Sequence, residues 1–239
     1  MHQLLPTSIA DVDPAVTYAE PLRSPRAGRP WVMANMVASI DGRAAVRGRT
    51  AALSNPGDRA VFKLLRTLAD VVLVGAGTVR AERYGPVKEG DRPPVAVISR
   101  SLDLDWDSPL FREAAQPTEI LTCEAADPVR LRLARKTAEV IVAGDKQVDL
   151  EQALAELAAR GHRVVLCEGG PHLLGELVAA DMIDELCFTV APLLAGGNEP
   201  SLIVAPPMDP PRSLRLASLI EDEGALLTRY LRSPPGAQL

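Results

Sequence analysis

The sequence predicts an α/β fold in which helices flank a central, mostly parallel β-sheet with an antiparallel edge. Short apolar runs alternate along the chain with stretches of helical periodicity, as in sheets that helices cover. Aromatic residues make up 3% and hydrophobic residues 47% of the 239 residues, so the core must be aliphatic. A chain of this size can bury such a core in a single domain, which we expect to span residues 31–232.

Several short segments have the composition of buried strands. Residues 70–74 show the pattern well, since Asp70 precedes an unbroken aliphatic run that ends at Gly75. Such runs are typical of parallel strands that are buried on both faces. The predicted strands are residues 31–39, 70–74, 94–98, 119–122, 138–142, 164–167, 185–191 and 226–231. The last two are expected to close the sheet as its antiparallel edge.

Helices are expected between these strands. One begins at residues 54–58, where a capping side chain, Pro56 in the first turn and the early acid Asp58 form a start signal. Its apolar face would carry Val61, Leu64, Leu65 and Leu68. A second helix is predicted over residues 149–160, where a glycine stops it, and a third over residues 173–180.

The two ends of the chain differ in composition from its interior. Residues 1–30 are rich in proline, alanine and charge. We interpret them as an irregular arm, which would contact a second subunit, or equally as a disordered tail. Residues 233–239 are expected to form a flexible tail, and residues 205–211 form a proline-rich loop between late strands.

Charge and cysteine content exclude several classes of protein. The formal net charge of −5 indicates no basic surface for nucleic acid. No apolar run reaches the ~20 residues of a membrane-spanning helix, and residues 1–6 do not predict a signal peptide. Cys123, Cys167 and Cys187 are widely spaced and odd in number, which indicates a reducing cytoplasm rather than a disulfide framework. The histidines are scattered as well, so no metal site is predicted.

Two predicted strands run into glycine-rich turns that lead into helices. Gly75 and Gly77 follow one strand, and Gly169 and Gly170 follow another. Ligands bind at the carboxyl ends of parallel strands, where glycine lets the backbone approach a phosphate closely. The first turn matches the dinucleotide fingerprint only in part, because Arg80 replaces its third glycine. Plain strand-to-helix connections remain the alternative interpretation.

A third strand end carries groups that suit a phosphate. Ser99 and Arg100 follow residues 94–98. A hydroxyl and a guanidinium at this point would suit the ribose 2′-phosphate of NADP, whereas an acidic residue would favour NAD. A solvated loop arginine is the alternative interpretation.

Several segments taken together carry a family resemblance. They are MVASIDGR at 36–43, SNPGD and LLR within 54–66, ADVVLVGAGTV at 69–79, EGGPHL at 168–173, and IDEL and APLLAGG within 183–197. In this order they resemble the reductase domain of the riboflavin-biosynthesis deaminase/reductase proteins. The resemblance implies a dihydrofolate-reductase-like fold and an NADPH-dependent reductase. The implied reaction transfers hydride to C1′ of a ribosylaminopyrimidine phosphate, so that the ribosyl group becomes ribityl. The zinc motifs of the deaminase half are absent from the sequence, so we expect a stand-alone reductase.

The resemblance also implies site residues by position. The cofactor-contacting positions are Val37, Ala52, Thr78, Glu82, Ser99 and the turn that contains Gly170, Pro171, His172, Leu173 and Leu174. Gly75, Gly77, Arg100 and Gly169 complete the expected NADPH site. The substrate-contacting positions are Thr50, Arg66 and Glu168. In related folds a paired glycine bears a cis peptide, and Gly169 and Gly170 are placed to do the same.

The sequence departs from the family pattern at two points. Ala52 stands where some members have tryptophan, and residues 81–88 replace an acid-rich segment. That segment would supply the arginine that binds the substrate phosphate. Arg83 and Lys88 are the candidates for this role.

Asp41 and Glu168 are the catalytic candidates. Asp41 ends the first strand, where it would place a polar group near the reacting carbon or simply belong to an Asp-Gly turn. Glu168 would bind the amino groups of the pyrimidine or cap the following helix. Arg66 would bind phosphate or the ribityl chain, or complement the dipole at its helix end.

Other functions remain open at the level of sequence. A reductase of a related heterocycle, such as dihydrofolate or a dihydropterin, would carry many of the same motifs. A homologue that binds NADP without catalysis, or a domain that binds a protein partner, would also keep the fold. The family usually forms dimers, so the resemblance implies a homodimer.

Overall fold

The structure is a computed structural model that describes residues 1–19, 23–26, 28–87 and 93–233. The chain divides into two compact units. Unit 1 comprises Met1–Arg23, Val32–Leu65 and Pro171–Leu239, and unit 2 comprises Ser24–Trp31 and Arg66–Gly170. Each unit has its own strands and helices.

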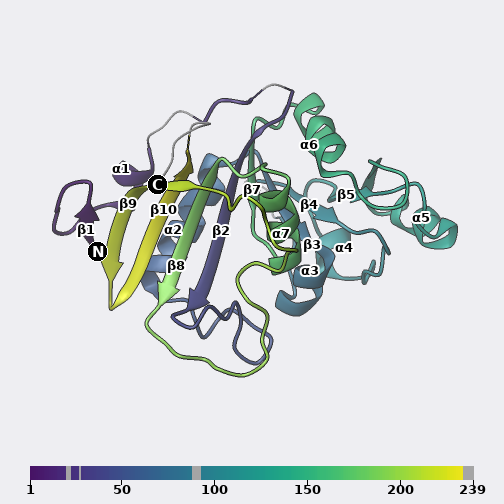
Figure 1. Ribbon diagram of the computed structural model, residues 1–239. Coiled ribbons are helices and arrows are strands. Elements are labelled where there is room, and N and C mark those ends of the chain that lie inside the picture. The colour runs from purple at the N-terminus through teal and green to yellow at the C-terminus, as the bar shows by residue number, and fades with distance from the viewer. Residues whose placement is uncertain (20–22, 27, 88–92, 234–239) are drawn as a thin grey trace. The chain divides into compact units, whose positions relative to one another are not determined.

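Unit 2 contains a parallel sheet. Its strands, in their order across the sheet, are β7 (Val164–Cys167), β3 (Val71–Gly75), β4 (Val95–Ile98), β5 (Glu119–Thr122) and β6 (Glu139–Val142). Each neighbouring pair is parallel, and Figure 1 labels β3, β4 and β5 in this unit. The residues of β3, β4, β5 and β7 are almost all buried, which confirms the apolar runs as parallel strands.

Short helices connect these strands. They are α3 (Ala76–Glu82), α4 (Pro109–Arg112), α5 (Pro128–Ala134) and α6 (Leu150–Ala159). The sequence prediction holds for α6, whose cap Asp149 accepts a hydrogen bond from the N–H of Gln152 at 3.0 Å. The sequence did not predict α4 and α5, because elements of one or two turns carry too few apolar residues to show a period.

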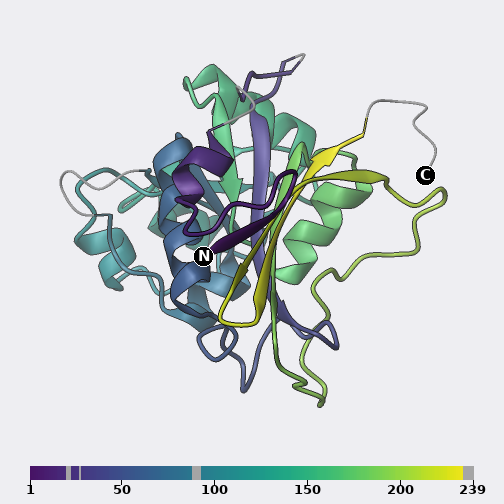
Figure 2. The same cartoon turned by 90° about the vertical axis from the view of Figure 1, so that its left-hand side faces the viewer.

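Unit 1 contains the antiparallel edge. β2 (Trp31–Ser39) runs parallel to β8 (Glu185–Ala191), and β10 (Ala225–Arg232), β9 (Leu214–Asp222) and β1 (His2–Leu5) follow in antiparallel pairs (Figure 1). α2 (Pro56–Leu68) and α7 (Pro171–Ala179) lie on opposite faces of these strands (Figure 2). The α/β class, the parallel strands and the antiparallel edge agree with the sequence prediction.

The start of α2 is as predicted and is fixed by close contacts. Asn55 accepts a hydrogen bond from the N–H of Asp58 at 2.8 Å, and the hydroxyl of Ser54 donates to the Asp58 carboxylate at 2.6 Å. A Cβ at Gly57 would lie 2.3 Å from Oδ2 of Asp222, so only glycine lets this first turn approach the end of β9. Val61 and Leu65 point into the core.

The N-terminal segment is more regular than the irregular arm or disordered tail that its composition suggested. It contains β1, which pairs with β9, and α1 (Pro14–Tyr18), which Asp13 caps by accepting from the N–H of Ala15 at 2.9 Å. The signal was weak because each element is at most five residues long. Residues 20–22 and 27 of the segment lie outside the described residues.

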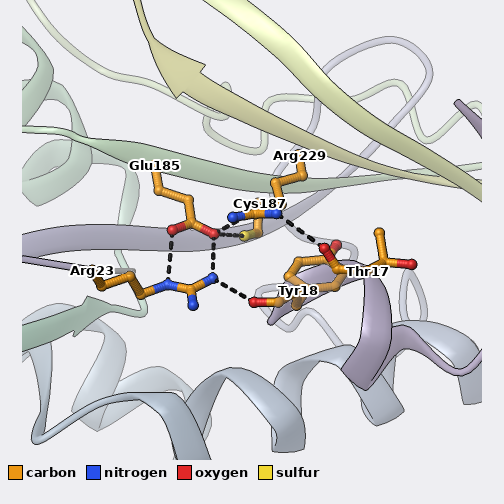
Figure 3. Close-up of polar contacts among 6 residues, drawn as sticks. All are labelled: Thr17, Tyr18, Arg23, Glu185, Cys187 and Arg229. Carbon is orange, nitrogen blue, oxygen red and sulfur yellow. Dashed lines mark hydrogen bonds and ion pairs between the residues drawn. The ribbon is translucent and has the colours of Figure 1, made fainter. Parts of the chain in front are cut away.

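A buried cluster of charges holds this segment to the sheet of unit 1 (Figure 3). Nε and Nη2 of Arg23 donate to the two carboxylate oxygens of Glu185 at 2.9 and 2.8 Å. Arg229 of β10 donates from Nε to Oε1 of Glu185 at 2.7 Å and from Nη1 to the carbonyl of Thr17 at 3.1 Å. Arg23 also donates to the carbonyl of Tyr18 at 3.1 Å. The side chain of Glu185 is 0% exposed, so this carboxylate depends on its two cations.

Two further predictions concern membranes and the C-terminal tail. Within the described residues, none of the helices combines the length and the apolar character that crossing a membrane would require. The proline-rich loop, residues 205–211, lies between β8 and β9, where the sequence placed it. Residues 234–239 of the predicted flexible tail lie outside the described residues.

Candidate active site

Glu168, directly after β7, is the centre of a hydrogen-bonded group in unit 2. Its side chain is 3% exposed. Arg66, from the last turn of α2, donates from Nε to Oε1 at 2.7 Å and from Nη2 to Oε2 at 2.8 Å. The hydroxyl of Tyr84 also donates to Oε2. A planar guanidinium that meets both oxygens of a carboxylate fixes its orientation as well as its charge.

The electrostatics of this group keep Tyr84 and Arg66 protonated. Burial and the charge of Glu168 raise the pKa of Tyr84 well above its ordinary value, so its phenol stays protonated and acts as a donor. Burial alone would lower the pKa of Arg66, but the hydrogen bond and charge of Glu168 outweigh that effect and raise it. The guanidinium carbon of Arg66 lies 6.0 Å from the centre of the Tyr84 ring.

The structure thus brings together two predicted substrate residues and one that the sequence analysis missed. From the sequence, Arg66 could bind phosphate or the ribityl chain, or complement the helix dipole. In the structure its partner is the carboxylate of Glu168. Tyr84 lies in residues 81–88, the segment that departs from the family pattern. This departure from the family pattern was the signal that could have pointed to Tyr84. No local sequence pattern identifies a tyrosine as the partner of a glutamate 84 residues later. Of the two phosphate-binding candidates, Arg83 is exposed and Lys88 lies outside the described residues.

The glycine turn after Glu168 has the geometry that the sequence suggested. The peptide between Gly169 and Gly170 is cis, and Gly169 has a φ of 86°. The N–H of Gly75, at the end of β3, donates to the carbonyl of Gly169 at 2.8 Å. A Cβ at Gly170 would lie 2.7 Å from Oγ1 of Thr78. A side chain at position 170 would therefore fill the space beside the hydroxyl of Thr78.

The second glycine turn leads into α3. Gly75 ends β3, and α3 begins at Ala76 and packs against β3 and β4. Gly77 is exposed, and a Cβ there would meet no atom within 4 Å. Because β3 and β7 run parallel, both turns lie along the same edge of the unit 2 sheet.

Ser99 and Arg100 lie at that edge as well, after β4. Ser99 is buried, and its hydroxyl accepts from the N–H of Leu102 at 3.0 Å, whereas Arg100 is exposed. Two cations that the sequence analysis did not select brace this loop. Arg130 donates to the carbonyl of Ser101 at 3.0 Å, and Arg80 donates to the carbonyl of Asp103 at 2.7 Å. Arg80, which replaces the third glycine of the dinucleotide fingerprint, thus supports this loop through its hydrogen bond to Asp103.

Cys167 precedes Glu168 but has no reactive character. It is fully buried and free, and burial raises the pKa of its thiol to about 12. A buried thiol of raised pKa is poorly suited to act as a nucleophile.

Asp41, in unit 1, has local partners. Its carboxylate accepts from the hydroxyl of Ser39 at 2.6 Å and from the N–H groups of Ala195 and Gly196 at 2.9 and 2.8 Å. These hydrogen bonds lower the pKa of Asp41 below the ordinary aspartate value. The contacts favour the turn role that the sequence analysis considered beside the catalytic one.

The other predicted positions differ in exposure. In unit 1, Val37 and Thr50 are half-buried, and Ala52 is exposed. In α7, Pro171 and His172 lie nearer the surface, while Leu173 and Leu174 are buried. The two leucines therefore pack in the core, and only their backbone atoms could meet a ligand. Glu82, in unit 2, is half-buried.

The predicted site residues are divided between the units. Unit 2 holds Arg66, Gly75, Gly77, Thr78, Glu82, Ser99, Arg100, Glu168, Gly169 and Gly170, and unit 1 holds the others. In unit 2 most of them follow the carboxyl ends of β3, β4 and β7. In the described part of the chain, no three His, Cys, Asp or Glu side chains are grouped so that they could hold a metal ion.

Comparison with known proteins gives a family match. The family model for the RibD C-terminal domain matches residues 30–226. The 2,5-diamino-6-ribosylamino-4(3H)-pyrimidinone 5′-phosphate reductase of Methanothermobacter thermautotrophicus is 30% identical over 184 residues, which cover 74% of this chain and 84% of that protein.

Solved structures agree with this match. A pyrimidine reductase-like protein from Corynebacterium diphtheriae superposes with a TM-score of 0.78 at 27% identity, over 92% of this chain and 98% of that one. The dihydrofolate reductase of Enterococcus faecalis has a TM-score of 0.50 at 16% identity, over 85% of this chain and 97% of that one. The second likeness concerns the fold alone and agrees with the predicted dihydrofolate-reductase-like class.

Proposed function

The chain belongs to the RibD C-terminal domain family, a family of riboflavin-pathway oxidoreductases, and we propose that it reduces a ribosylaminopyrimidine phosphate with NADPH. The reaction converts the ribosyl group to a ribityl group. The observation that carries the proposal is the edge of the unit 2 sheet, where two glycine turns and the Arg66–Glu168–Tyr84 group follow parallel strands.

The residues present fit a dinucleotide. A Cβ at residue 170 would lie 2.7 Å from Oγ1 of Thr78, so glycine is needed for this close approach, and the open surface at Gly77 allows a phosphate to approach the backbone. We assign the pyrophosphate to the turns at Gly75–Gly77 and Gly169–Gly170. When bound, the nicotinamide supplies the hydride that reduces C1′ of the open-chain ribosyl group.

Selectivity for NADPH over NADH is assigned to the loop after β4. Arg100 is exposed there beside Ser99 and is available to a 2′-phosphate. The contacts of Arg80 and Arg130 with the carbonyls of Asp103 and Ser101 support the shape of this loop. Both cations also pair with the carboxylate of Asp103, at 3.9 and 3.6 Å, which offsets part of their charge.

Glu168 binds and orients the heterocycle. Its carboxylate is buried, and Arg66 fixes its plane. Heterocycle N–H or amino groups are the donors that such a carboxylate accepts. Orientation of this kind places the ribosyl chain for reduction and is a major part of what a protein adds to hydride transfer. Asp41 has the role of fixing its own turn, since its hydrogen bonds and low pKa suit neither a proton donor nor a base.

Two properties of the whole chain belong to the same proposal. Free, buried cysteines suit the reducing cytoplasm, where we place the enzyme. We also propose a homodimer, which exposed apolar residues near the N-terminus support, namely Leu4, Leu5, Ile9 and Val16. Analytical ultracentrifugation measures this directly.

Steady-state oxidation of NADPH tests the proposed reaction. We expect turnover with the ribosylaminopyrimidine phosphate, and no turnover with dihydrofolate or a dihydropterin. Turnover of dihydrofolate alone would contradict the substrate assignment. Tight binding of NADPH without turnover of any heterocycle would instead indicate a non-catalytic homologue.

A further inference from the structure

Tyr84 is the member of the Glu168 group for which the proposed reaction has so far given no role. It follows α3 and lies next to Arg83, which has a left-handed φ of 53° and ends the helix. This backbone turn carries the tyrosine to the end of β7, where its hydroxyl meets Oε2 of Glu168.

The two carboxylate oxygens of Glu168 accept different numbers of hydrogen bonds. A carboxylate has about four acceptor positions, two on each oxygen. Oε2 accepts from Nη2 of Arg66 and from the Tyr84 hydroxyl, whereas Oε1 accepts from Nε of Arg66. Counting the donors among the residues that the structure describes, both positions of Oε2 are filled, and one acceptor position remains, on Oε1.

Tyr84 acts here as a donor and not as a source of protons. Burial and the charge of Glu168 raise its pKa, so the phenol does not ionise near neutral pH. Loss of its proton would place a phenolate beside a buried carboxylate, which is unfavourable. Its ring also lies beside the guanidinium of Arg66, 6.0 Å from the guanidinium carbon, so it contacts both partners of the ion pair.

We propose that Tyr84 is a positioning residue that fills Oε2 of Glu168, so that the site accepts one N–H or amino donor of the heterocycle, on Oε1. This inference rests on the proposed function and refines its substrate class. A ring edge that presents one donor at this point fits the carboxylate. An edge with two adjacent donors gains no second hydrogen bond from Glu168 unless Tyr84 leaves.

Tyr84→Phe tests the proposal, because it removes the hydroxyl and keeps the ring beside Arg66. Oε2 then has an open position and the carboxylate loses one of the contacts that hold it, so the ring is no longer held in one orientation and is bound less tightly. We expect the KM and Kd for the pyrimidine phosphate to rise about tenfold, with kcat and the Kd for NADPH changed less than about threefold. Tyr230→Phe, in β10, is the matched control and should change none of these values.

NMR of the ¹³Cζ atoms of the tyrosines gives a readout that a merely structural role would not move. The chain has three tyrosines, so Tyr84→Phe assigns the signal. Addition of the pyrimidine phosphate, but not of NADPH alone, should shift the Tyr84 resonance. In Glu168→Gln the titration of Tyr84 should move to lower pH, because the charge that raises its pKa is gone.

The outcomes separate this inference from the proposed reaction. Equal losses of pyrimidine and NADPH affinity in Tyr84→Phe, or no loss of either, would overturn the positioning role. A wild-type protein that binds the pyrimidine phosphate without reducing it would contradict the reaction, while the ratio of the two Kd values still decides the role of Tyr84. A wild-type protein that binds no pyrimidine phosphate would overturn both.

Discussion

Gly170 is the residue at which the addition of one atom, a Cβ, would disturb the candidate site most. A Cβ there would approach Oγ1 of Thr78 to 2.7 Å, closer than real Cβ atoms come to their neighbours. The glycine is therefore needed for the space beside the hydroxyl of Thr78, which we assign to the cofactor pyrophosphate.

Gly170→Asp should abolish measurable binding of NADPH. The new side chain would occupy the space beside Thr78, and its negative charge would repel a pyrophosphate. Isothermal titration calorimetry measures this affinity. Gly85→Ala is the matched control, since a Cβ at Gly85 would meet no atom within 4 Å. Unchanged affinity in Gly170→Asp, with a normal melting temperature, would contradict the assignment of the turn.

Arg100→Ala should weaken NADPH about tenfold or more and leave NADH almost unchanged. The lost interaction would be a charge-assisted hydrogen bond to the 2′-phosphate, which NADH lacks. The ratio of the two KM values measures the effect. Arg112→Ala serves as control because Arg112 pairs with Asp107 on the surface, at 2.6 Å. Equal losses for the two cofactors would reject the role of Arg100.

The residues of this site differ in how far the sequence could predict them. The glycine pairs are visible because they follow clear buried strands. Arg66 and Glu168 came from the family resemblance, and their mutual ion pair joins residues that lie far apart in the sequence, which no local pattern reveals. Tyr84 was missed for the same reason. Asp41 ends a strand in a way that suits catalysis or a turn, and the N–H groups of Ala195 and Gly196 that decide between them become neighbours only in the folded chain.

At the scale of the element, burial decides what the sequence could predict. Strands such as β3 and β7 are buried throughout and appear as unbroken apolar runs. β9 is only half-buried along most of its length, and β1 is largely exposed, so neither has a clear pattern. The antiparallel edge was therefore predicted in part, from β8 and β10 alone.

The turn after β2 gives a prediction that depends on pH. Asp41→Asn should lower the melting temperature at pH 7, because an amide cannot accept from both Ala195 and Gly196 as the carboxylate does. The folded pKa of Asp41 is lowered, so its contribution is present above the ordinary pKa of 3.8 and is lost as the pH falls below that value. The difference in melting temperature between wild type and variant should accordingly shrink below about pH 4.

Two observations control this experiment. Asp145→Asn, at an exposed carboxylate, should show little difference from wild type at any pH. A gap between wild type and Asp41→Asn that stays constant down to acid pH would contradict the turn role of the ionised carboxylate.

The attachment of the N-terminal segment gives a second prediction at this scale. Glu185→Gln leaves Arg23 and Arg229 without their shared carboxylate in a buried environment. We expect the free energy of unfolding to fall by about 3–5 kcal/mol, and trypsin to cleave faster after Arg23. Asp107→Asn, which breaks an exposed ion pair, should cost under about 1 kcal/mol. Equal stability of the two variants would show that the buried cluster does not hold the segment.

For the enzyme as a whole, we propose that the carboxyl edge of the unit 2 sheet serves a hydride transfer to a sugar carbon. The family agrees with that proposal, since the chain matches the RibD C-terminal domain. The likeness to dihydrofolate reductase concerns the fold alone. Reduction of a sugar chain and reduction of a heterocyclic ring differ in the atom that receives the hydride. The destination of the hydride therefore distinguishes the proposed reaction from its rival.

The most direct measurement follows this hydride with a label. NADPH that carries deuterium in place of both hydrogens at C4 of the nicotinamide is incubated with the enzyme and the ribosylaminopyrimidine phosphate, and the product is analysed by mass spectrometry and NMR. We predict one deuterium per product molecule, on C1′ of the ribityl chain. Absence of deuterium from C1′, or its transfer to the ring of dihydrofolate or a dihydropterin instead, would contradict the proposed function.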